Sequence, residues 1–158
     1  MPDDRMMLRH TVATLAYRAA KALRGAPPGF AEVRGSPTSR NAGQILAHMC
    51  DLFDWALHLA HGKHVWKDTQ PTTWEADSAR FFAAVKAFDD YLASDQPLGR
   101  VPQILFQGPV ADALAHTGQI NYLRRMGGSP VRGESYARAD IMTGRVTADQ
   151  APPKAEFD

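Results

Sequence analysis

Hydrophobic positions recur every three or four residues in four segments of the chain, and no segment shows the sustained alternation of a strand. The pattern therefore predicts an all-α protein. Each segment is about twenty residues long, and polar connections separate them, so we expect a four-helix bundle with long connections. The tail after these segments is rich in Gly and Pro and is predicted to be irregular, with at most a short helical turn. The predicted helices cover residues 3–24, 41–61, 73–94 and 108–126.

The spacing also predicts which side chains of the first three helices are buried, because residues three and four apart share a helix face. These positions are Leu8, Val12, Leu15, Ala16, Ala19 and Leu23 in the first helix, Ile45, Met49, Leu52, Phe53 and Ala56 in the second, and Trp74, Phe81, Val85, Phe88 and Leu92 in the third.

Capping residues indicate where the helices begin and end. Asn41 with Gln44 three positions later predicts a capping box at the start of the second helix, and Thr72 with Glu75 predicts another at the third. Pro109 is placed in the first turn of the fourth helix, where the missing N–H of proline is tolerated. The Gly-Gly pair after the fourth helix is expected to end it.

Composition and charge exclude some classes of protein and favour others. The chain has 158 residues, enough for one domain, and we expect a single domain over residues 1–158. Its 18 Lys and Arg nearly balance its 17 Asp and Glu, which argues against nucleic acid as a partner. No apolar run approaches the ~20 residues that span a bilayer, and the acidic start does not resemble a signal peptide. A single cysteine, Cys50, fits a reducing compartment, so we expect a cytoplasmic protein without a membrane partner.

Three side chains are candidate metal ligands. In the fourth helix, Asp112 precedes His116 by four residues, so both lie on one face, which we predict to point inward with Ile120 and Leu123. His48, at the margin of the second helix's apolar stripe, can reach the same interior. Two imidazoles and a carboxylate make a three-ligand set that leaves positions open for water or substrate. A local hydrogen-bond network between the same residues is the alternative interpretation.

Other residues are candidates for the pocket. Gln119 is predicted to orient a ligand or to make a structural hydrogen bond, while Trp55 and Tyr122 are predicted to line the cavity. The tail segment after the fourth helix either folds over the mouth of the bundle or ties the tail down, through Arg132, Glu134 and Tyr136.

The phrases GQILAHMCDLFDW (43–55) and ADALAHTGQINYLRRMGGSPVRGESY (111–136) resemble the DinB/YfiT-like superfamily. The second phrase is similar to that family's fourth-helix signature of histidine, three residues, histidine, one residue, glycine and glutamine. The resemblance implies a four-helix bundle, often dimeric, with a metal held by one histidine of the second helix and two of the fourth. His48 and His116 match two of these positions, and Asp112 stands where the family has its first histidine.

The resemblance implies a divalent metal, with zinc or nickel as the first candidates. Iron and manganese are the second candidates, since a carboxylate ligand suits all four ions. Characterised relatives use low-molecular-weight thiols, so the implied function is a metal-dependent hydrolase or thiol-dependent transferase acting on a small molecule. The alternative is a non-enzymatic dimeric binding module with a vestigial metal site. Val110 and Leu114, predicted to project opposite His116, are the expected dimer contacts.

Overall fold

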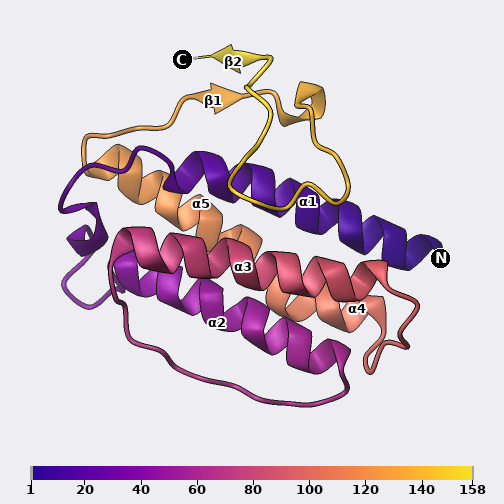
Figure 1. Cartoon of the computed structure of the whole chain (residues 1–158). Helices are drawn as coiled ribbons and strands as arrows, with labels where there is room; N and C mark the ends of the chain where they lie inside the picture. The colour runs from indigo at the N-terminus through magenta and orange to yellow at the C-terminus, as the bar shows by residue number, and fades with distance from the viewer. Residues whose placement is uncertain (1, 158) are drawn as a thin grey trace.

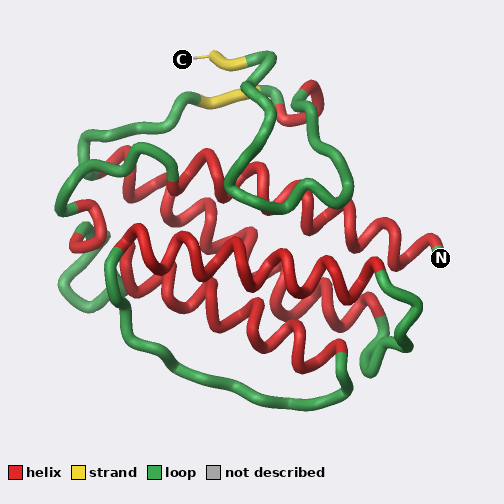
Figure 2. Tube along the Cα trace, in the orientation of Figure 1, coloured by secondary structure: helices red, strands yellow, loops and turns green. Residues whose placement is uncertain are grey.

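The computed structural model describes residues 2–157 and is mostly helical (Figures 1 and 2). Within these residues, no helix combines the length and the hydrophobicity needed to cross a membrane. The long helices are α1 (Asp3–Leu23), α2 (Ala42–Ala60), α3 (Trp74–Ala93) and α5 (Ala111–Met126). The short elements are η1 (Phe30–Glu32), α4 (Pro102–Leu105), η2 (Phe106–Val110), β1 (Gly133–Glu134), η3 (Tyr136–Arg138) and β2 (Glu156–Phe157).

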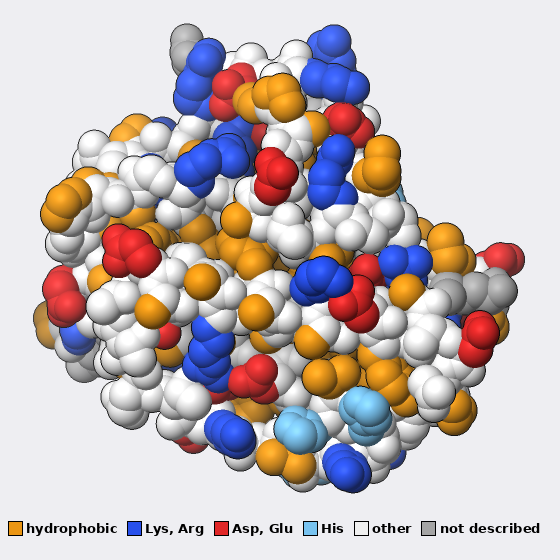
Figure 3. All heavy atoms as spheres, in the orientation of Figure 1, with side chains coloured by type: hydrophobic (Ala, Val, Ile, Leu, Met, Phe, Trp, Pro, Cys, Tyr) orange, Lys and Arg blue, Asp and Glu red, His pale blue; other side chains and the backbone are white. Residues whose placement is uncertain are grey.

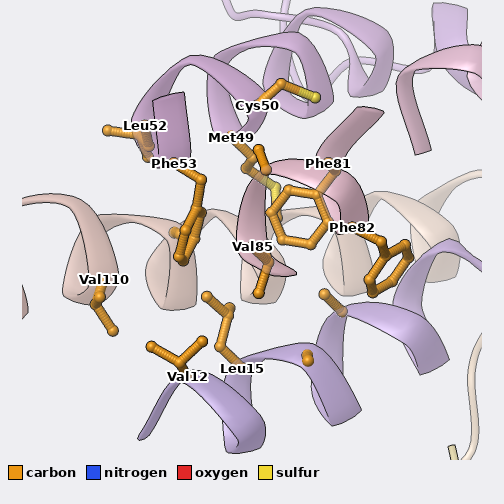
Figure 4. Packing of buried hydrophobic residues seen from close by; sticks show 14 of the residues in the cluster. Val12, Leu15, Met49, Cys50, Leu52, Phe53, Phe81, Phe82, Val85 and Val110 are labelled. Atoms are coloured by element: carbon orange, nitrogen blue, oxygen red, sulfur yellow. The ribbon is translucent and has the colours of Figure 1, made fainter. Parts of the chain in front are cut away.

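The long helices pack around one hydrophobic core, as the spacing predicted. α2 lies along α3, and α1 and α5 complete the core from the other side (Figure 1). Phe53 of α2 packs edge-on against both Phe81 and Phe88 of α3, with ring centroids 5.8 Å apart in each pair. Figure 4 shows Phe53 and Phe81 in the same cluster as Val12 of α1 and Val110. Of the predicted core positions in the first three helices, Trp74 alone is only partly buried.

The N-terminus of α2 has the predicted capping box, whereas that of α3 is capped differently. The Asn41 side chain accepts from the Gln44 amide at 2.8 Å, and the Gln44 side chain accepts from the Asn41 amide at 2.9 Å. The cap of α3 is Thr73, whose hydroxyl accepts from the backbone of the third helical residue. Thr72 instead binds Asp77 through both its amide and its hydroxyl, so the predicted Thr72 box is wrong by one residue.

Helical structure begins before the predicted fourth helix, at Pro102, which lies in the first turn of α4. Pro109, predicted for that place, lies inside the wider π turn η2 instead. Proline offers no N–H to the helix ladder and its ring crowds the carbonyl four residues back, and a wider turn relieves both constraints. The buried positions Leu105 and Val110 are consequently five residues apart.

The buried face of α5 continues from Val110, the last residue of this turn. The core residues of α5 are Ala113, Thr117, Ile120, Leu123 and Arg124. The prediction that Asp112 and His116 point into the core is therefore wrong. The buried face is rotated by about one residue from the predicted face, and both side chains lie at its edge. Val110 is fully buried and therefore cannot be the predicted dimer contact, whereas Leu114 is only partly buried against the core.

Two buried arginines join the helix ends. Arg5 of α1 donates to four carbonyls at the end of α3, including that of Leu92 at 2.7 Å. Arg124 of α5 donates to the carbonyls of Ala22 and Arg24 at the end of α1, at 2.9 Å each. The last carbonyls of a helix lack partners within it, so these guanidinium groups satisfy them and fix the helices relative to each other.

The tail returns over α1 and forms a two-stranded antiparallel sheet of β1 and β2 (Figure 1). Glu134 of β1 is buried and accepts from Tyr17 at 2.9 Å and from Lys21 at 2.7 Å. Tyr136 packs edge-on against Tyr17, with ring centroids 6.2 Å apart. These contacts tie the tail to the helices, which is the second of the two roles predicted for this segment.

Candidate metal centre

The three predicted ligands lie together between α2 and α5. Asp112 Oδ2 lies 3.4 Å from His48 Nε2 and 3.4 Å from His116 Nε2. The two imidazole rings stand nearly perpendicular, with centroids 4.8 Å apart. Among residues 2–157, this is the group of His, Cys, Asp and Glu side chains that could hold a metal ion, and its ligand atoms lie within 4.8 Å of one another.

The donor set fits a divalent transition metal. Two ligands of a tetrahedral ion with bonds of about 2.0–2.1 Å are roughly 3.3 Å apart, which matches the two nitrogen–oxygen distances. Imidazole nitrogen with carboxylate oxygen suits zinc, nickel, iron and manganese alike. Three ligands leave at least one coordination position for water or substrate.

The imidazoles are shielded and the carboxylate is not. The side chains of His48 and His116 are 15% and 13% exposed, whereas that of Asp112 is 47% exposed. Burial lowers the pKa of His48, the hydrogen bond that Asp112 accepts opposes this, and Arg40 and His116 lower the pKa further. The lowered pKa favours the neutral imidazole, the form that binds a metal ion.

Gln119 holds His116 in one orientation. Its Oε1 accepts from Nδ1 of His116 at 2.7 Å, while Nε2 of the same ring faces Asp112. One turn of helix separates the two residues, so the backbone of α5 sets this contact. This is the hydrogen bond to the remaining ring nitrogen that metal-ligating histidines normally make.

Trp66, which the sequence analysis did not select, covers one side of His48. Its ring lies edge-on to His48, with centroids 5.5 Å apart, and edge-on to Trp55 at 5.7 Å. Trp55 donates from its indole nitrogen to His64 at 3.1 Å. The signal available in the sequence was a large aromatic residue in an otherwise polar loop.

The loop that carries Trp66 is fixed to the helices through Asp51. Asp51 accepts from the amide and the hydroxyl of Thr69 at 2.9 Å each, and from Arg80 of α3 at 2.7 Å. Arg80 also binds Asp54 at 2.7 Å. These contacts hold a segment without regular secondary structure across the site (Figure 2).

A groove of about 810 Å³ opens beside His116, and Gln119, Tyr122 and Arg40 line it. Trp55 is not among its lining residues and packs against Trp66 instead. A second groove of about 270 Å³ lies on the other side of Tyr122, and Arg132 and Tyr136 line it. Glu134 lines neither groove.

Basic and acidic side chains are interspersed on the face seen in Figure 3, in keeping with a formal net charge of +1.

Comparison of the chain with models of protein families, with curated proteins and with solved structures finds no match.

Proposed function

We propose that His48, Asp112 and His116 bind a divalent metal ion, and that the chain is a four-helix bundle of the DinB/YfiT-like type. The observation that carries this proposal is the equal 3.4 Å distance from Asp112 to the two imidazole nitrogens. Zinc or nickel is the first candidate, and iron or manganese follows because the set includes a carboxylate.

We further propose that the protein is a hydrolase or a thiol-dependent transferase that acts on a small molecule in the adjoining groove. A bound divalent ion supplies Lewis acidity, which favours the deprotonated, nucleophilic form of water or of a low-molecular-weight thiol at neutral pH. Gln119 orients His116, and Trp66 covers one side of His48. His116 lines the groove, so the cluster is accessible from it.

The chain's own thiol does not serve as this nucleophile. Cys50 is buried, and burial raises the pKa of its thiol to about 12. It donates to the carbonyl of Asp77 at 3.3 Å, on the side of α2 that faces α3. Any reactive thiol is therefore supplied by a substrate.

A non-enzymatic binding module is the second candidate. The hydrogen bond between His116 and Gln119 and the contacts of Asp112 with both histidines also form a closed polar network that needs no ion. In this alternative the site is vestigial and the chain acts as a homodimer. Its candidate contact is the exposed apolar group near the start of α1 and along α4 and η2, with Met7, Val101, Ile104 and Phe106.

Metal analysis distinguishes the two candidates. Full-length protein purified without a histidine tag is dialysed against zinc, nickel, iron or manganese, and its metal content is measured by mass spectrometry. The metal proposal expects one ion per chain for wild type and for His58→Ala, a control histidine on α2 outside the cluster, and none for His116→Ala. Wild-type protein that retains no stoichiometric metal under any of these conditions overturns it and supports the binding module.

A further inference from the structure

The two grooves beside α5 adjoin each other. Gly118 and Tyr122 belong to the walls of both. The larger groove begins at His116, next to the metal cluster, and the smaller one lies between α5 and the tail, where Arg125 forms part of its wall.

The charged residues of both walls are all cationic. Arg40 lines the larger groove, and Arg125 and Arg132 line the smaller one, while no Asp or Glu lines either. Arg132 is 59% exposed and lies 3.8 Å from Glu156, a carboxylate that also binds Lys21 at 3.0 Å. The two ends of the combined groove thus attract anionic groups.

The middle of the combined groove is apolar and open. Ile45, Leu123 and Met126 contribute apolar surface to the larger groove. A Cβ atom added at Gly118 would meet no atom within 4 Å, so helix packing does not require glycine here. Glycine inside a helix costs about 1 kcal/mol relative to alanine. Gly118 keeps the floor between the two grooves free of a side chain.

We propose that the combined groove binds an elongated small molecule that has an apolar middle and an anionic group at each end, as a linear dicarboxylate has. One anionic group lies beside Arg40 and the metal cluster, and the other lies between Arg125 and Arg132. His116 and Arg125 are nine residues apart on α5, a rise of about 13 Å, which sets the length of the ligand. The inference rests on the proposed function in taking the His116 end as the reactive one.

Calorimetric titration with a series of linear dicarboxylates from succinate to sebacate tests the groove. The long members are expected to bind more tightly than the short ones, and suberate more tightly than octanoate or 1,8-diaminooctane. Arg125→Gln and Arg132→Gln are each expected to weaken suberate binding about three- to tenfold, as loss of a hydrogen-bonded charge does. Arg138→Gln, an exposed arginine outside both grooves, serves as the control and should bind as wild type does.

Substitution of Gly118 provides the sharper test, because the stability of the protein and its affinity for suberate should change in opposite directions. Gly118→Ala is expected to raise the melting temperature while weakening suberate binding, and Gly118→Leu to abolish binding without unfolding the protein. Both variants binding suberate as wild type does, or octanoate binding as tightly as suberate, would overturn the proposal.

Metal content is measured on the same samples, with titrations of both metal-free and zinc-loaded protein. If suberate binding depends on Gly118 but no metal binds, the groove proposal is supported. In that case only the proposed metal function fails. Stoichiometric zinc without any dicarboxylate binding overturns the groove and leaves the metal proposal standing.

Discussion

The side-chain oxygen of Gln119 accepts a hydrogen bond from Nδ1 of His116 at 2.7 Å, so the outer nitrogen of that imidazole is free to face Asp112. A contact within a single helical turn thereby fixes the direction of a proposed ligand. The contribution of Gln119 to metal binding can be separated from that of the ligands themselves.

Replacing Gln119 should weaken metal binding without unfolding the protein. Gln119→Leu removes the acceptor from an exposed position and is expected to lower zinc affinity about 10- to 100-fold, the usual cost of losing such a partner. Gln119→Glu keeps an acceptor and should retain or increase affinity. Competition titration with a chromophoric chelator measures both, and equal affinity of Gln119→Leu and wild type would contradict the assigned role.

Asp112 should set which metal the site prefers. Asp112→His supplies a third imidazole, which favours zinc and nickel over manganese, whereas a carboxylate accommodates all of them. The variant is expected to increase the ratio of nickel to manganese affinity, and Asp112→Ala to lower the affinity for every ion. Competition between two metals, with content read by mass spectrometry, gives the ratio directly. An unchanged ratio in Asp112→His would show that this position is not a ligand.

The Cys50 thiol should be unreactive in the folded protein and should make stability depend on alkaline pH. Burial raises its pKa from an ordinary value of 9.0 to about 12. The unfolded chain therefore loses this proton at lower pH, so the contribution to stability is complete below pH 9 and is lost as the pH rises toward 12.

Two measurements check this behaviour. A disulfide reagent at pH 8 should label Cys50 only after denaturant is added. Denaturant unfolding of wild type and of Cys50→Ala across pH 8 to 11 should show a steeper loss of stability for wild type. Rapid labelling of the folded protein would contradict the assigned burial.

Arg124 should be among the residues most important for stability. Arg124→Met leaves carbonyls at the end of α1 without their donor and is expected to cost about 2–4 kcal/mol, because each buried acceptor left unpaired costs about 1–3 kcal/mol. The neighbouring Arg125 is exposed, and Arg125→Met should change stability by less than about 0.5 kcal/mol. Urea unfolding compares the two, and similar losses for both variants would contradict the capping role.

The sequence by itself determined the four long helices and the buried faces of the first three. Local periodicity decides these features, because any helix must bury its apolar stripe. The capping box of Asn41 and Gln44 was equally readable, since both partners lie within one turn. The spacing placed Asp112 and His116 on one helix face, and the function of their cluster with His48 as a metal site stays a prediction.

The tertiary structure decided the phase of α5 and what surrounds the cluster. Asp112 and His116 lie at the rim of the core because the buried face of α5 is the one that carries Ala113, Thr117 and Ile120. The placement of Trp66 depends on Asp51, Thr69 and Arg80, which come from three separate segments. Contacts between distant segments depend on how whole helices dock, and a local pattern of hydrophobic and polar residues does not encode that docking.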